Sequence, residues 1–180
     1  VQSVETKPIP RKDFIKIYQE AMKDPYMHAR IEIGGMVGPR PGEALGLKWS
    51  DIDWDAQILT LERQVQREPG KGLVFQTVKQ NEVRSVLLSD EQIRILLTHK
   101  RHQALNKANW KEDDDLVFPN TKGRKCDEKR DRKMFKDLLV QAWVGDYQLY
   151  QLRKTAYSNM ASVTDMRTLK DFSGHAQVAT

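Results

Sequence analysis

The chain has 180 residues, 39% of them hydrophobic, and a single cysteine, Cys126, so it can form one domain core but has no internal disulfide framework and no cysteine-rich zinc site. Because it contains no apolar run long enough to span a membrane and opens with no signal peptide, we expect a cytoplasmic protein. Thirty basic against twenty-five acidic side chains give a net charge of +5, which favours a polyanionic partner such as nucleic acid.

The first ten residues differ in composition from the rest of the chain. Residues 1–10 contain two prolines and few apolar side chains, which is typical of a linker from a longer protein. Apolar residues at helical spacing then predict a helix from Arg11 to Met22 and a second helix that begins at Tyr26, after Pro25.

The stretch IEIGGMVGPRPGEALGLKWSDID, Ile31 to Asp53, bends at Arg40. Apolar residues on both sides of its Gly-Pro and Pro-Gly pairs predict two helices joined by a tight turn. Pro41 suits the first position of the second helix, and Glu43 falls in the first turn, where its carboxylate can complement the helix dipole or bond a guanidinium. Arg40 is therefore either an anion-binding residue or a surface residue of a helix-turn-helix junction.

After this corner the apolar pattern changes to β-rich runs. The runs Ile58–Gln66, Leu73–Val78 and Val83–Leu88 are separated by the turn sequences EPGKG and KQNE, and they predict a small three-stranded antiparallel sheet. Lys79 stands at the second turn, where a lysine is either a solvated residue at a hairpin tip or a functional amine.

A long helix is predicted from Asp90 to Asn106, opened by a capping box between Ser89 and Gln92. His99 and His102 share one face of this helix. With no third ligand nearby and basic neighbours, we expect a solvated face rather than a zinc pair, and so no metal site.

A basic segment follows a short apolar one. Leu116–Pro119 is predicted to be buried, and residues 120–133 then concentrate basic side chains, which suit a DNA backbone or a solvated loop. The candidate DNA-binding residues are Lys122, Arg124, Lys125, Lys129 and Arg130. The apolar residues that we expect on the core face of the following helix, residues 127–140, are Phe135, Leu138, Leu139 and Trp143.

The last part of the chain contains two further motifs. YQLYQLRKTAYSNM, residues 147–160, predicts a helix that carries Arg153, and Tyr157 lies one turn later on a face that we expect to pack in the core. In LKDFSGHAQVAT, residues 169–180, a short helix ends at Gly174 and His175 follows directly.

Together and in this order, these motifs resemble the catalytic domain of the tyrosine recombinases, the phage-integrase family. GPRPGEALGLKWSDID is similar to the family's Gly-x-Arg-x-x-Glu-x-x-x-Leu box, which a tryptophan and an aspartate-rich turn follow. TVKQNEVRSVLL is similar to Thr-x-Lys-x-x-x-x-Arg-x-Val-x-Leu, YQLR to His-x-x-Arg, and LKDFSGHAQVAT to Leu-x-x-x-x-Gly-His-x-x-x-x-Thr. The resemblance covers nearly the whole chain after the leader and implies a mainly helical α+β fold.

The resemblance implies site-specific DNA recombination, in which DNA is cleaved and rejoined through a 3′-phosphotyrosyl intermediate without a metal or other cofactor. Arg40 and Arg153 would grip the oxygens of the phosphate, with His175 as a further hydrogen-bond donor. Glu43 would orient Arg40, and Lys79 would act as general acid toward the leaving 5′-hydroxyl.

Two features depart from the family pattern. Tyr150 stands where relatives have histidine, and we interpret it as a hydrogen-bonding site residue because a phenol with an ordinary pKa of about 10 is a poor base at neutral pH. The nucleophilic tyrosine is absent and is expected just after Thr180. Residues 11–180 are therefore interpreted as a catalytic domain that binds double-stranded DNA but lacks its nucleophile, and residues 1–10 as a leader left by a deleted N-terminal DNA-binding domain.

The intact protein is expected to act as a homotetramer on DNA in a bacterial host, and the isolated chain to be monomeric. Three other interpretations remain open at this point. They are a type IB topoisomerase-like enzyme, a non-catalytic DNA-binding regulator on the same fold, and a helix-turn-helix module with accidental motif matches.

Overall fold

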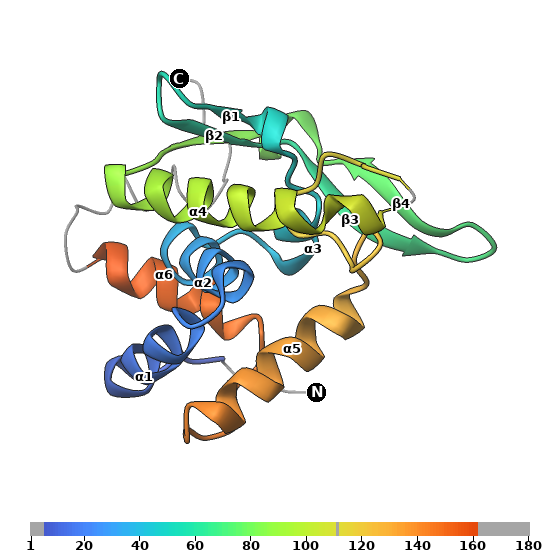
Figure 1. Ribbon diagram of the computed structural model, residues 1–180. Helices are drawn as coiled ribbons and strands as arrows, with labels where there is room; N and C mark the ends of the chain where they lie inside the picture. The colour runs from blue at the N-terminus through green and yellow to red at the C-terminus, as the bar shows by residue number, and fades with distance from the viewer. Residues whose placement is uncertain (1–5, 111, 162–180) are drawn as a thin grey trace, which may run out of the picture.

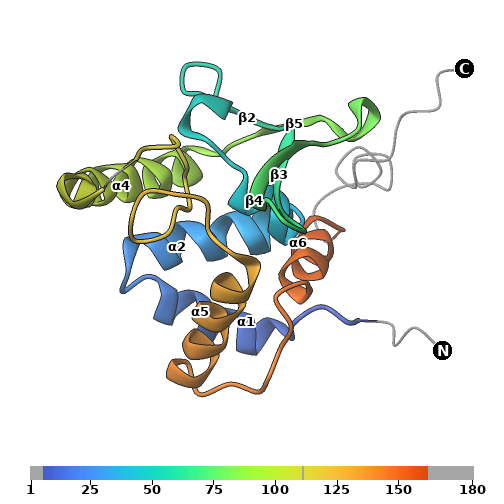
Figure 2. The same cartoon turned by 90° about the vertical axis from the view of Figure 1, so that its right-hand side faces the viewer.

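The structure is a computed structural model that describes residues 6–110 and 112–161 (Figure 1). It confirms a mainly helical α+β fold with a small antiparallel sheet. The sheet lies along one long helix at one end of the molecule, and two further helices lie at the other end (Figures 1 and 2). In the part of the chain that is described, no helix combines the length and the apolar character needed to cross a membrane.

The helices of the described residues agree with the expected ones, and the helix expected to end at Gly174 lies outside those residues. They are α1 (Arg11–Ala21), α2 (Pro25–Glu32), α3 (Pro41–Leu45), α4 (Asp90–Asn106), α5 (Glu128–Gln141) and α6 (Gln151–Ala161). A π-helical turn, η1 (Ile33–Val37), extends α2, and three short 3-10 turns are η2 (Trp49–Asp51), η3 (Gln80–Glu82) and η4 (Lys107–Asn109). The predicted capping box at the start of α4 is confirmed, because the Ser89 backbone N–H donates to Gln92 Oε1 (2.9 Å) and the Gln92 N–H to Ser89 Oγ (3.2 Å).

A three-stranded antiparallel sheet is present, but its strands are not the three that the sequence suggested. The strands are β1 (Ile52–Asp53), β2 (Ile58–Leu61), β3 (Arg63–Glu68), β4 (Gly72–Thr77) and β5 (Arg84–Leu87). The sheet has the order β1-β2-β5, whereas β3 and β4 form a separate hairpin.

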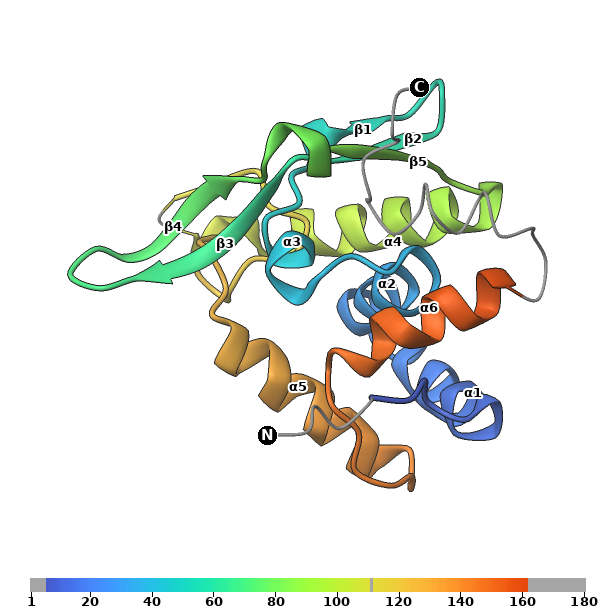
Figure 3. The same ribbon diagram turned by 180° about the vertical axis from the view of Figure 1, so that it is seen from behind.

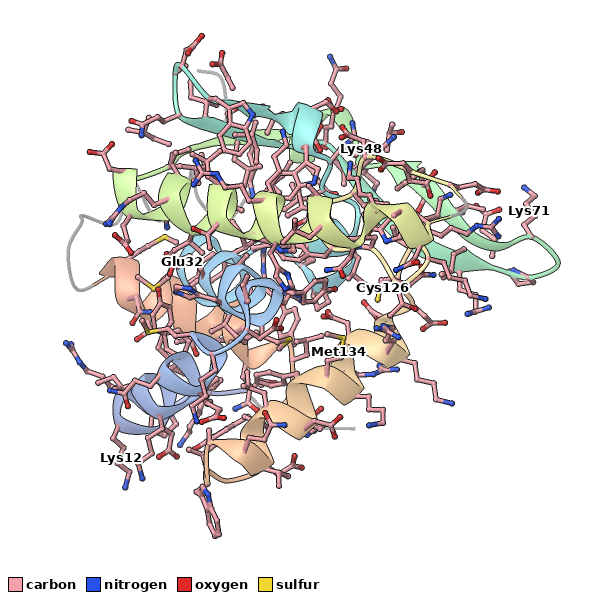
Figure 4. The ribbon with its side chains drawn as sticks, viewed as in Figure 1. Lys12, Glu32, Lys48, Lys71, Cys126 and Met134 are labelled. Carbon is pink, nitrogen blue, oxygen red and sulfur yellow. The ribbon has the colours of Figure 1, made fainter. Side chains whose placement is uncertain are left out.

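The predicted run Ile58–Gln66 is split at Glu62, so that its two halves pair with different strands. Leu59 pairs with Val86 in the sheet, and Val65 pairs with Phe75 in the hairpin. Leu59 and Leu61 are buried, so the first half is held against the core. The hairpin instead projects beyond the helices, and Lys71 stands at its far end (Figures 3 and 4).

Two hydrophobic clusters form the core. One joins the sheet to α2, α4 and the segment Leu116–Phe118, which is buried as predicted. The other joins α1, α5 and α6. A buried ion pair links α2 to α5, because Arg30 Nε donates to Asp131 Oδ1 (3.0 Å) and Arg30 Nη2 to Asp131 Oδ2 (2.7 Å).

The predicted burial was wrong for Trp143 and for His99. Trp143 is 90% exposed, because α5 ends at Gln141 and Trp143 adopts a left-handed backbone (φ 56°) that turns it out of the helical face. His99 is buried rather than solvated. It stacks on Phe118, and its Nε2 lies 2.6 Å from the Val117 carbonyl oxygen, whereas His102 is exposed.

The Arg30–Asp131 pair generates a stability prediction. Asp131→Ala leaves a buried guanidinium without its partner, so it should lower the free energy of unfolding by about 3–5 kcal/mol, as measured by urea denaturation. Asp137→Ala is the matched control on the same helix, because Asp137 pairs with Lys133 (2.8 Å) at the surface and should cost no more than about 1 kcal/mol. Equal losses in the two variants would contradict this account.

Candidate active site

The site is built on the turn between η1 and α3. Gly38 ends η1 with a φ of 76°, and a Cβ at this position would lie 2.8 Å from Ala156 Cβ on α6, so both the backbone and the close packing require glycine. Arg40 is the N-cap residue of α3 and Pro41 its first helical residue. The turn lies beside α6 (Figure 3), and the Arg40 side chain is half-exposed.

One buried carboxylate binds two arginines. The side chain of Glu43 is 1% exposed, and its Oε1 accepts from Arg40 Nη1 (3.0 Å) and Arg84 Nη1 (3.2 Å). Its Oε2 accepts from the Arg40 backbone N–H (2.8 Å) and Arg84 Nη2 (2.8 Å). Burial alone would raise the pKa of Glu43, but the bonds and charges of Arg84 and Arg40 hold it below its ordinary value, so the carboxylate is ionised at neutral pH.

A third guanidinium reaches the same turn from α6. Arg153 is 5% exposed, its Nη1 donates to the Gly38 carbonyl oxygen (2.7 Å), and its guanidinium carbon lies 4.8 Å from the centroid of the Tyr157 ring. Burial lowers the pKa of Arg153, and the positive charges of Arg84 and Arg40 lower it further. The three arginines, from the start of α3, from β5 and from α6, therefore converge at one place.

The turn that carries Lys79 lies beside Arg40. Glu82, at the end of η3, has its Oε2 4.0 Å from Arg40 Nη1. Lys79 immediately precedes η3 and is exposed.

Tyr150 faces the same side of the molecule and is 44% exposed. With Arg40 it lines a groove of about 750 Å³ that runs from the start of α3 past β3 to the first turns of α5. Lys129, Arg132 and Arg67 contribute basic side chains to this groove, and Arg67 pairs with Asp127. The groove therefore joins the arginine site to a basic surface.

The predicted DNA-binding residues lie in different surroundings. Lys129 lines the groove, but Arg130, the next residue, lines a different cavity with Tyr26 and His99. Arg124 pairs with Glu112 (2.5 Å), Lys125 pairs with Asp114 (3.5 Å), and Lys122 is exposed in the same loop.

His175 lies outside the described residues. Within the described part, no group of three metal-ligating side chains gathers. Our reading of the sequence missed Arg84 as a partner of Glu43, although the Lys79 motif contains it. It also missed the position of Tyr157, which is half-buried beside the arginines rather than in the core. The sequence signal for this position was the four-residue spacing between Arg153 and Tyr157, which places both side chains on one face of a helix.

Residues 9–180 match the family model described as "Phage integrase family". A curated relative, the "Tyrosine recombinase XerC-like" protein of Caldanaerobacter subterraneus subsp. tengcongensis, is 25% identical over 182 residues, which cover 92% of this chain and 46% of the relative. This chain thus spans about half the length of that relative.

Two solved structures illustrate the similarity of fold. The Tn1549 transposon integrase in complex with transposon right end DNA has a TM-score of 0.82 at 17% identity, covering 97% of this chain and 59% of that one. The XerA recombinase has a TM-score of 0.74 at 20% identity, covering 99% and 57%.

The bonds of Glu43 generate a prediction with a pH dependence. Glu43→Gln should lower the free energy of unfolding by about 3 kcal/mol at pH 7, because the variant loses the charge that pairs two guanidiniums. Because the pKa of Glu43 is lower in the folded protein than in the unfolded chain, its ionisation stabilises the fold. This stabilisation is complete at pH values above the ordinary pKa of 4.5, and it is lost as the pH falls through the folded-state pKa. Denaturation at successive pH values should therefore show the two proteins converging below pH 4.5.

Glu62, whose side chain is 45% exposed and pairs with Arg63, provides the control. Glu62→Gln should change the free energy of unfolding by less than about 1 kcal/mol at every pH. A constant difference between Glu43→Gln and the unaltered chain down to acid pH would refute the assigned role of the Glu43 charge.

Proposed function

Because the chain belongs to the phage integrase family, we propose that it is the catalytic domain of a site-specific tyrosine recombinase, one that cleaves and rejoins double-stranded DNA. The observation that carries the proposal is the convergence of Arg40 and Arg153 on the turn at Gly38, beside a basic groove. Transfer of a phosphoryl group develops charge on non-bridging oxygens, and two guanidiniums can bind those oxygens bidentately.

Each site residue has a proposed part in this chemistry. Arg40 and Arg153 bind the phosphate, and the Glu43 carboxylate fixes Arg40 from both its backbone and its side chain. The Lys79 amine donates a proton to the leaving 5′-hydroxyl. Tyr150 hydrogen-bonds the DNA at the edge of the groove, and His175 supplies a further donor.

The groove supports double-stranded DNA as the partner. Lys129 and Arg132 line it near the N-terminus of α5 and bring positive charge there, although Asp127 and Glu128 line the same place and Asp127 caps the helix. We place the DNA backbone along this wall, with the cleaved phosphate at Arg40. Lys122, Arg124 and Lys125 lie on the loop before α5 and would contact phosphates farther along the duplex.

Known relatives suggest the biological setting. One structural neighbour is a lambda integrase tetramer bound to a Holliday junction, with a TM-score of 0.61 at 15% identity. We infer that the whole protein acts as a homotetramer on DNA, as the recombinase of a phage or another mobile element in the bacterial cytoplasm.

The nucleophile is not one of the five tyrosines of this chain. Tyr18 donates to Glu32 (2.6 Å), Tyr147 donates to Asp13, and the Tyr26 hydroxyl is buried in the core. Tyr157 is not assigned as the nucleophile because burial raises its pKa, which disfavours the phenolate. Tyr150 is assigned to a hydrogen-bonding role.

Neighbouring residues on α5 test the assignment of the groove. Lys129→Ala should weaken binding to a fluorescent duplex and reduce the slope of log K against log salt by about 0.9, the value for one lost phosphate contact. Arg130→Ala removes an equal charge from the adjacent position, which lines the other cavity, and should leave the slope unchanged. If both variants reduced the salt slope equally, binding would depend only on the net charge of the protein, and the groove would not be the DNA site.

A suicide substrate tests the assignment of the tyrosines. The chain should bind nicked suicide duplexes without forming a covalent adduct, as judged by denaturing electrophoresis with a related recombinase on its own substrate as positive control. An adduct that Tyr150→Phe abolishes would show that Tyr150 is the nucleophile and would overturn its assigned role.

A further inference from the structure

Two tyrosine hydroxyls in the described part of the chain are buried without a hydrogen-bond partner. One belongs to Tyr26, whose ring packs edge-on against Phe118 and His99. The other belongs to Tyr157, on α6 beside the arginine site. An unpaired buried donor destabilises a protein, so phenylalanine would be the more stable residue at either position.

The position of Tyr157 is fixed by its neighbours. It follows Arg153 by four residues, so both side chains leave the same face of α6. Its ring lies under the Arg153 guanidinium, and a Cβ at Gly38 would be 3.6 Å from Tyr157 Cε1. The ring is therefore held between Arg153 and the turn that leads to Arg40.

The hydroxyl of Tyr157 lies in the field of all three site arginines. Burial raises its pKa, and the positive charges of Arg153, Arg84 and Arg40 oppose that rise. Because the pKa remains above its ordinary value, the hydroxyl keeps its proton at neutral pH and is available as a donor. An anion attracted by the guanidiniums would supply the acceptor that the described residues do not.

We propose that the Tyr157 hydroxyl donates a hydrogen bond to the same phosphate that Arg40 and Arg153 bind. The proposal rests on the function proposed above and adds a phosphate-binding residue to it. The proposal explains why position 157 carries a hydroxyl, although this hydroxyl destabilises the protein when no phosphate is bound.

Tyr26 provides a matched control, because Tyr26→Phe and Tyr157→Phe each remove one buried, unpartnered hydroxyl and keep the ring. Both variants should melt about 2–4 °C higher than the unaltered chain. Inorganic phosphate is the probe, titrated at constant ionic strength and followed by the NMR signals of the arginine Nε–H groups. Tyr157→Phe should bind phosphate about tenfold more weakly, and Tyr26→Phe should bind it as the unaltered chain does.

A pH series separates loss of a donor from a general change in the site. Since the phenol stays protonated, the ratio of the two phosphate affinities, Tyr157→Phe against the unaltered chain, should be constant from pH 6 to about pH 9. A ratio that disappeared within this range would contradict a protonated donor.

The remaining outcomes distinguish this proposal from the function on which it rests. If Tyr157→Phe bound phosphate normally while Arg40→Ala lost binding, the hydroxyl would have no role and the arginine site would stand. If Tyr26→Phe lost affinity equally, the effect would come from the fold and the proposal would fail. If the unaltered chain bound neither phosphate nor duplex DNA, both proposals would fall.

Discussion

The carboxylate of Glu43 is the group on which the geometry of the site depends. It is nearly inaccessible to water, and an isolated carboxylate in such a place would be protonated. Two guanidiniums and a backbone N–H hold it ionised, and in return it fixes their positions. The Glu43 side chain thereby joins the start of α3 to strand β5. Its bonds also hold the Arg40 side chain in one rotamer, which points toward the groove.

A second contact brings α6 to the same turn. Arg153 donates to the Gly38 carbonyl oxygen, and the absence of a side chain at Gly38 lets Ala156 approach closely. Three guanidiniums then share one region with a single buried carboxylate, Glu43. Burial lowers the pKa of Arg153, and the like charges of Arg84 and Arg40 lower it further, because positive charges held close together repel each other. Such an arrangement favours the binding of an anion, because an anion relieves the repulsion among the guanidiniums and these groups are already in position.

The charged region is supported by the packing of the helices. The Arg30–Asp131 pair ties α2 to α5, and the two hydrophobic clusters lie on either side of it. The first turns of α5 form one wall of the groove, and the β3–β4 hairpin, which projects from the core, forms another. The proposed DNA site therefore lies between a packed helix and a projecting hairpin, in a groove lined by four basic and two acidic side chains.

The sequence by itself determined the features that depend on neighbouring residues. Hydrophobic spacing and the Ser89 capping box gave the bounds of α4, and the glycine and prolines around Arg40 gave its turn, because helix and turn preferences act over a few residues. Only the tertiary structure decided which groups meet across long separations. Four features depend on where the packed core ends, and no local sequence pattern encodes that boundary. They are the split of the strand at Glu62, the burial of His99, the exposure of Trp143 and the ion pair between Arg84 and Glu43.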